Sequence, residues 1–158
     1  MKGLEMEFNT AFEFVPIDKR RTISKPRKSG ITMVSDYQLG LASLSDLIEV
    51  AGHYIDLFKI ATGTSRLFEK THLQAKIEML RANDIRPFLG GQFQEYVLHT
   101  MGVDAMPQHL SEAQALGFDI IEISDNMVQL GQGLRQQLFD MVRDHGMNPV
   151  GEIGDKRE

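Results

Sequence analysis

The sequence predicts an α/β fold in which parallel strands alternate with amphipathic helices, and two observations support this prediction. Short apolar runs of strand type recur five times from residue 31 onward. Segments with the 3.6-residue period of a helix separate these runs, and such alternation implies parallel strands joined by right-handed crossovers. We therefore divide the chain into an N-terminal arm, 1–24, and a β/α domain, 25–158.

The first strand is predicted over residues 31–36 and is followed by a helix. Apolar residues recur at positions i, i+3, i+4 and i+7 over residues 44–51, which indicates an amphipathic helix. Ser43 with Asp46 three residues later has the pattern of a capping box at its start. Gly52 is expected to end it, because glycine is favoured just after the last helical turn.

The second strand is predicted over residues 54–60, YIDLFKI. A helical stripe follows and ends near Asn83; its apolar positions are Leu73, Ile77 and Leu80. The third strand, 85–89, is short and contains Pro87, which cannot donate a hydrogen bond to a neighbouring strand.

Two helices, near 93–101 and over 107–116, precede the fourth strand. That strand, 119–124, is the clearest of the five because apolar and polar residues alternate in it. A further helical period ends at Gly146, and residues 148–153 form the fifth strand.

A closed barrel and an open doubly wound sheet both fit this element order. Polar side chains at the strand ends favour the barrel, where the ends of several strands meet on one face; they are Asp36, Lys59, Glu122, Ser124 and Glu152. We predict a (β/α)8 barrel of the TIM-barrel type, of which this chain carries about the first five units. The outer strands would then be edges, so we expect a homo-oligomer or association through those edges.

Composition restricts the partners. A net charge of −5 and a pI near 5.5 argue against nucleic acid, whose phosphates require a basic surface. No apolar run approaches the roughly 18 residues of a membrane span, and the first residues lack a secretory pattern. The sequence contains no cysteine, which excludes disulfides and thiolate metal sites and fits a reducing compartment. We expect a cytoplasmic protein.

One basic cluster precedes the first strand. We interpret it as a solvated arm, with contact to an anion or a second subunit as the alternative. Its members are Lys19, Arg20, Arg21, Lys25, Arg27 and Lys28.

Five stretches carry a resemblance to a known family: KPRKSGITMV (25–34), YIDLFKIATGTS (54–65), RPFLGGQFQEY (86–96), LGFDIIEISDN (116–126) and VGEIGDK (150–156). Their order and spacing resemble the phosphosulfolactate synthase family. The resemblance implies a (β/α)8 barrel that adds sulfite to phosphoenolpyruvate with Mg²⁺, an early step toward coenzyme M, or acts on a related phosphorylated or sulfonated three-carbon acid. The partner expected on this basis is a small anionic substrate.

The chain departs from the family pattern at three places. Family members read KxGWGTS where this chain has KIATGTS (59–65), which replaces a glycine and an indole. They read PGGT where this chain has LGGQ (89–92). They commonly carry two lysines after EVG, whereas here Asp155 precedes Lys156.

Both substrates of such a reaction are anions, so the site requires fixed positive charge. Lys59 lies at the end of the second strand, where its ammonium would reach the mouth of the barrel. The alternatives are a lysine that extends from the strand end to solvent and, in an aldolase, a Schiff-base lysine. Lys156 is a second candidate cation or part of a solvated tail.

Gly63, Thr64 and Ser65 follow Lys59 and could hold phosphate or sulfonate oxygens through backbone N–H groups and hydroxyls. The alternative is a plain turn with a Thr or Ser N-cap. Gly90 and Gly91 indicate either a close backbone approach or a tight turn.

Gln92 next to them could donate a hydrogen bond to a ligand carboxylate.

The period of two turns Glu122 and Ser124 toward the barrel interior, where Ser124 is a further candidate for substrate or anion binding, as are Gly90 and Gly91. A carboxylate in that position is costly unless it is paired. We therefore interpret Glu122 as a metal ligand or acid–base partner, with a structural Glu122–Lys59 ion pair as the alternative.

Asp125 and Glu152 complete the predicted metal set with Glu122, although Asp125 could instead cap the following turn. The five histidines form no ligand motif, and we interpret them as structural or surface residues.

The leading hypothesis is thus a lyase of this family. The alternative is a non-catalytic barrel remnant that acts as a stress-associated or interaction protein.

Overall fold

The computed structural model describes residues 11–16, 18, 20 and 24–154, and a parallel sheet organises this part of the chain. The strands are β1 (Met33–Asp36), β2 (Leu57–Ile60), β3 (Arg86–Leu89), β4 (Ile120–Ser124) and β5 (Asn148–Glu152). Their order in the sheet is β1-β2-β3-β4-β5, the same as in the sequence. A doubly wound sheet reverses its order at a switch point. The order observed here confirms the predicted partial barrel.

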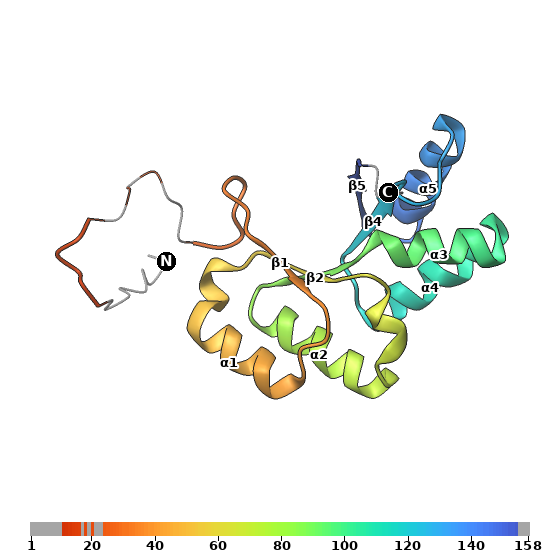
Figure 1. Cartoon of the computed structure of the whole chain (residues 1–158). Coiled ribbons are helices and arrows are strands. Elements are labelled where there is room, and N and C mark those ends of the chain that lie inside the picture. The colour runs from red at the N-terminus through yellow and green to blue at the C-terminus, as the bar shows by residue number, and fades with distance from the viewer. Residues whose placement is uncertain (1–10, 17, 19, 21–23, 155–158) are drawn as a thin grey trace.

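Helices follow the strands as the sequence predicts. They are α1 (Leu41–Ala51), α2 (Lys70–Ala82), α3 (Gly91–Met101), α4 (Met106–Leu116) and α5 (Gln132–Asp144). The described residues also form three short 3-10 turns: η1 (Gly52–Tyr54) between α1 and β2, η2 (Thr64–Leu67) between β2 and α2, and η3 (Val103–Ala105) between α3 and α4. Figure 1 shows α1 and α2 beside β1 and β2, with α3, α4 and α5 around β4 and β5. No helix in the described residues is both long and apolar enough to cross a bilayer.

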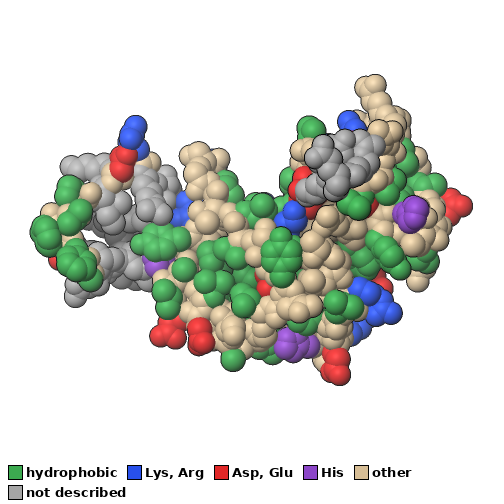
Figure 2. Space-filling view, viewed as in Figure 1, with side chains coloured by type: hydrophobic (Ala, Val, Ile, Leu, Met, Phe, Trp, Pro, Cys, Tyr) green, Lys and Arg blue, Asp and Glu red, His purple; other side chains and the backbone are tan. Residues whose placement is uncertain are grey.

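The hydrophobic core lies between the sheet and the helices. Alternate strand residues such as Phe58, Ile60 and Ile121 face the helices and are fully buried. The opposite face of the sheet is the barrel interior, and the other alternate side chains of each strand point toward it. Toward β1 this face is open to solvent: Met33 is 46% exposed. In Figure 2, apolar side chains cover much of the middle of the visible surface, over β1 and β2.

Two local predictions in this region were wrong. The first helix begins at Leu41 with Gly40 as its N-cap, so Ser43 and Asp46 lie inside the helix and make no capping box. The second strand begins at Leu57, because Gly52–Tyr54 continues from the helix as a 3-10 turn. Gly52 itself has a φ of −54°, so the helix ends through this turn and not through a left-handed glycine.

Asp36 does not join the polar side chains of the barrel interior, which corrects the prediction that placed it there. In β1 the residues in phase with the interior are Met33 and Ser35, so Asp36 points toward the helices. There it forms a fully buried ion pair with Lys76 of α2, whose ammonium also donates to the carbonyl of Leu39. Asp36 accepts the backbone N–H of Leu39 at 2.7 Å. This carboxylate is therefore structural.

Two residues of the basic cluster are also structural and not solvated. Arg27 donates to Asp56 at 2.9 Å, and both side chains are less than a tenth exposed. Asp56 also accepts the backbone N–H of Thr32. Lys25 donates to the carbonyl of Gly52 at 2.6 Å, and burial lowers the pKa of Lys25. These contacts hold the segment before β1 against the amino-terminal end of the sheet. Lys19 and Arg21 lie outside the described residues.

Candidate active site

Lys59 and Glu122 meet on the interior face of the sheet. Lys59 lies on β2 and Glu122 on β4, and the two side chains reach across β3. Nζ of Lys59 is 2.7 Å from Oε1 of Glu122, with the side chains 13% and 5% exposed. Nζ also lies 5.7 Å from the ring centroid of Phe88 between them. The structure thus contains the ion pair that the sequence offered as one of two interpretations of Glu122.

Gly90 and Gly91 allow the close approach that holds this pair. The backbone N–H of Gly91 donates to Oε2 of Glu122 at 2.6 Å. A Cβ on Gly91 would lie 2.5 Å from Cβ of Ser124, and one on Gly90 would lie 2.9 Å from the carbonyl of Ile60. The close approach is therefore between parts of the protein itself, and it places the first residue of α3 against Glu122.

Ser124 and Glu152 are brought together on adjacent strands, as predicted. Their Oγ and Oε2 atoms are 3.3 Å apart. The fully buried Asn126 links them, because its Nδ2 lies 2.7 Å from both atoms. No role for Asn126 is predicted from the sequence. Its position two residues after Ser124 was the available signal, since short polar side chains there can fold back onto the strand end.

Glu95 is a second buried carboxylate that the sequence did not reveal. It lies on α3, is 2% exposed, and accepts a hydrogen bond from the hydroxyl of Ser124. Its other oxygen accepts the backbone N–H groups of Met127 at 2.5 Å and Val128 at 2.6 Å. Glu95 occurs between Phe93 and Val97 without matching their apolar period, so the pattern gave no signal for it.

The loop after β2 has an unusual backbone. Thr62 has a φ of 53° and Gly63 a φ of 74°, both in the left-handed region. A β-branched residue is rarely found there, and such strain is concentrated at functional sites. Thr64 donates its hydroxyl to the carbonyl of Ala61, and the buried Oγ of Ser65 has no partner among the described residues. Residues 64–67 form a short 3-10 turn, but neither hydroxyl caps a helix, so the N-cap part of the alternative was wrong; the predicted anion binding stays a prediction.

The predicted metal set is not assembled within the described residues. Asp125 forms an ion pair with Arg135 of α5. Among the residues that the structure describes, no three His, Cys, Asp or Glu side chains are placed to hold one ion. Glu122 and Glu152 remain as two carboxylates on the interior face. Lys156 lies outside the described residues.

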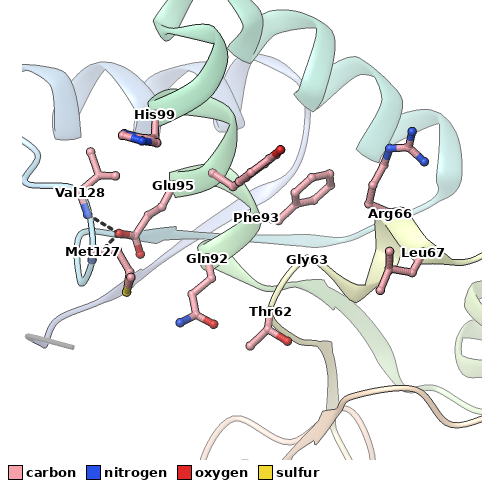
Figure 3. A pocket seen from close by; sticks show the side chains of 11 residues that line it. Thr62, Gly63, Arg66, Leu67, Gln92, Phe93, Glu95, His99, Met127 and Val128 are labelled. Carbon is pink, nitrogen blue, oxygen red and sulfur yellow. Dashed lines mark hydrogen bonds between the residues drawn. The ribbon is translucent and has the colours of Figure 1, made fainter. Parts of the chain in front are cut away.

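A groove of about 690 Å³ lies beside this cluster, between η2, α3 and the segment after β4 (Figure 3). Gly63 and Gln92 from the predicted anion-binding set line it, whereas Lys59 and Glu122 do not. Glu95 forms part of its wall, and Figure 3 shows its carboxylate turned toward Met127 and Val128.

Phe93 lines the same groove and packs on its inner side against His109 of α4, with ring centroids 5.0 Å apart. Burial lowers the pKa of His109 to about 4.

The fold and this cluster define the class: part of a β/α barrel with charged side chains at the carboxyl ends of its strands. Residues 20–158 match the model of the (2R)-phospho-3-sulfolactate synthase (ComA) family, and the chain belongs to that family. This confirms the resemblance described above.

Two curated relatives are phosphosulfolactate synthases. The protein of Methanothermobacter thermautotrophicus is 35% identical, and that of Methanocaldococcus jannaschii is 30% identical, each over 92% of this chain and 54% of the relative. Protein HEAT-STRESS-ASSOCIATED 32 of Arabidopsis thaliana is 25% identical over 78% of this chain and 43% of the relative. The chain thus spans about half the length of the curated relatives that it matches.

Proposed function

We propose that this chain contributes the anion-binding half of a lyase site that joins sulfite to phosphoenolpyruvate or to a related phosphorylated or sulfonated three-carbon acid. The observation that carries the proposal is the Lys59–Glu122 pair at the strand ends, next to a strained loop of small polar residues. Family membership supports the reaction type. The absence of cysteine supports a reducing, cytoplasmic setting.

In the proposed reaction the sulfur lone pair of sulfite forms a bond with the methylene carbon of the enol phosphate. The electrons of the double bond move to C2 and the adjacent carboxylate, and a proton is then added at C2. The ammonium of Lys59 would stabilise the developing negative charge and supply that proton, while Glu122 orients Lys59. Lys156 would be a second cation.

The phosphate or sulfonate is proposed to lie against Gly63, Thr64 and Ser65. Ser65 supports this because its buried hydroxyl has no partner in the described part of the chain. Gln92 is proposed to donate to the substrate carboxylate; its side chain forms no hydrogen bond with another described residue and faces the groove. Gly90 and Gly91 would act indirectly, by letting Glu122 and Ser124 approach α3.

The described residues fit Mg²⁺ only as a site with one or two protein ligands. Mg²⁺ commonly uses one or two protein carboxylates and takes its other ligands from substrate oxygens and water. Glu152, with Glu122 as the second choice, is the proposed ligand, because both lie on the interior face of the sheet, whereas Asp125 pairs with Arg135 of α5. The ion would supply electrostatic stabilisation of the enolate oxygens.

The test is to incubate the protein with phosphoenolpyruvate, sulfite and Mg²⁺ and to measure both consumption of phosphoenolpyruvate and the shift in melting temperature. We expect a shift that Lys59→Met abolishes. Lys28→Met, which changes an exposed lysine, is the matched control. The proposal is rejected if the wild type consumes no phosphoenolpyruvate and shows no shift in melting temperature.

That result would favour the second candidate, a non-catalytic, stress-associated or interaction protein. The relative named for heat stress is the observation in its favour.

A third candidate function is an aldolase that uses Lys59. Borohydride distinguishes it from the lyase and the non-catalytic protein, because it would trap a Schiff base between Lys59 and a carbonyl substrate as a covalent adduct.

We also propose that the chain associates with itself through the outer edges of β1 and β5, which pair with no further strand among the described residues. Sedimentation velocity over a range of concentrations tests this, and a single monomeric species throughout would reject it.

A further inference from the structure

The groove beside the charged cluster is the feature that the proposed chemistry leaves unexplained. Its volume of about 690 Å³ lies within the range of about 300–1,000 Å³ that is typical of small-molecule sites. A three-carbon phosphate is a small molecule and would occupy a minor part of it at the Gly63 end. The remaining space is lined by α3, and Lys59 is not among the lining residues.

Apolar side chains from three separate segments form the rim of this groove. Leu67 of η2 is 74% exposed, Tyr96 of α3 is 63% exposed, and Met127 after β4 is 53% exposed. Exposed apolar groups that surround one concave surface indicate a binding site, whereas single ones scattered over the surface need no explanation. Phe93 adds an aromatic ring to the wall next to Gly63.

The polar groups of the lining fit an anionic ligand with an apolar body. Glu95 is the acidic residue of the wall, and its carboxylate is already satisfied by Ser124 and two backbone N–H groups. Arg66 is exposed, lines the groove and makes no side-chain hydrogen bond or ion pair with another described residue. Its guanidinium can therefore contact a negatively charged group at the rim or stack on a ring.

We propose that the groove binds the apolar, ring-sized body of an anionic ligand whose phosphate or sulfonate head is held at residues 63–65. Besides a three-carbon acid, the chain would thus bind a larger anion that carries an aromatic or branched aliphatic group in contact with Tyr96, Leu67 and Phe93. The inference rests on the proposed anion site. A protein partner fits less well, because stable protein interfaces bury about 1,600 Å² in total, far more than this groove presents.

Two non-hydrolysable probes with the same head group test the proposal: methylphosphonate and phenylphosphonate, each titrated into the full chain by calorimetry. We expect phenylphosphonate to bind at least about tenfold more tightly, because its ring is removed from water in the groove. Tyr96→Ala and Leu67→Ala should bring the ratio of the two affinities close to one. Both side chains are mostly exposed, so neither change should prevent folding.

Val50→Ala is the matched control, since Val50 is an equally exposed apolar residue on α1 and should leave the ratio unchanged. Equal affinity for both probes, with binding that Lys59→Met weakens, would overturn the groove inference and leave the proposed function intact. A preference for phenylphosphonate that persists in both groove variants would also overturn it. No binding of either probe would reject the anion site and this inference with it.

Discussion

The ammonium nitrogen of Lys59 lies 2.7 Å from Oε1 of Glu122, and the backbone N–H of Gly91 donates a hydrogen bond to Oε2 at 2.6 Å. One buried carboxylate thus joins β2, β4 and the start of α3. Both of its oxygens have partners, which is what allows a charge to remain in the interior. This arrangement gives the first of four predictions.

Lys59→Met should lower the free energy of unfolding by about 3 kcal/mol, because Glu122 would lose its counter-charge in a site that is 5% exposed. Adding Glu122→Gln should recover part of the loss. Urea unfolding measures both. Lys70→Met is the control: its pair with Glu112 spans 3.9 Å and is more than 60% exposed, so the cost should stay below about 1 kcal/mol. An equal loss of unfolding free energy in Lys59→Met and Lys70→Met would contradict the prediction.

Gly91→Ala should destabilise the protein by about 2 kcal/mol, because the added Cβ would lie 2.5 Å from Cβ of Ser124 and 2.9 Å from Cγ of Glu122. Gly133→Ala in α5 is the matched substitution, since nothing lies within 4 Å of its Cβ position. It should stabilise the protein by roughly 0.5–1 kcal/mol through helix propensity. Thermal unfolding of both variants tests the pair, and the same sign of change in both would be inconsistent with this packing.

Glu95→Gln should loosen the segment after β4. The neutral amide accepts the backbone N–H groups of Met127 and Val128 less strongly than a carboxylate does, at a cost of about 2 kcal/mol. Hydrogen exchange should become faster at those two amides. Glu49→Gln, an exposed change on α1, is the control. Unchanged exchange at Met127 would show that Glu95 does not hold this segment.

His109 predicts a pH dependence of stability. Burial lowers its folded-state pKa from 6.5 to about 4, so between these values the unfolded chain binds a proton that the folded chain does not. Stability should therefore fall as the pH drops from 6.5 toward 4, by up to about 3 kcal/mol from this residue. His109→Leu should make the dependence shallower. Gln108→Leu, a neighbouring exposed change, should not; an unaltered slope in His109→Leu would refute the prediction.

The sequence predicted the order of elements because apolar periodicity is a local property. It placed Lys59, Glu122, Ser124 and Glu152 on one face because strand phase fixes the direction of each side chain. The prediction for Asp36 was wrong because it used only the position of this residue at a strand end. The phase of β1 turns Asp36 toward the helices. Lys76 was detectable in principle, since it continues the stripe of Leu73 and Ile77 on α2.

Other parts of the site depend on contacts between segments distant in sequence. Glu95 accepts hydrogen bonds from residues about thirty positions further along the chain, and no local pattern encodes that distance. Arg27 likewise reads as part of a basic arm until Asp56 is seen beside it. The groove results from three segments meeting, so its lining could not be predicted from any one of them.

Gly90 alone separates the end of β3 from the start of α3. The same helix donates Gly91 N–H to Glu122 and presents Gln92, Phe93 and Tyr96 to the groove. Such a direct junction leaves no hinge between the Lys59–Glu122 pair and the wall of the groove. Discrimination between ligands would then depend on a shape already set when the chain folds, and exchanging side chains along α3 would change preference without disturbing the charges beneath.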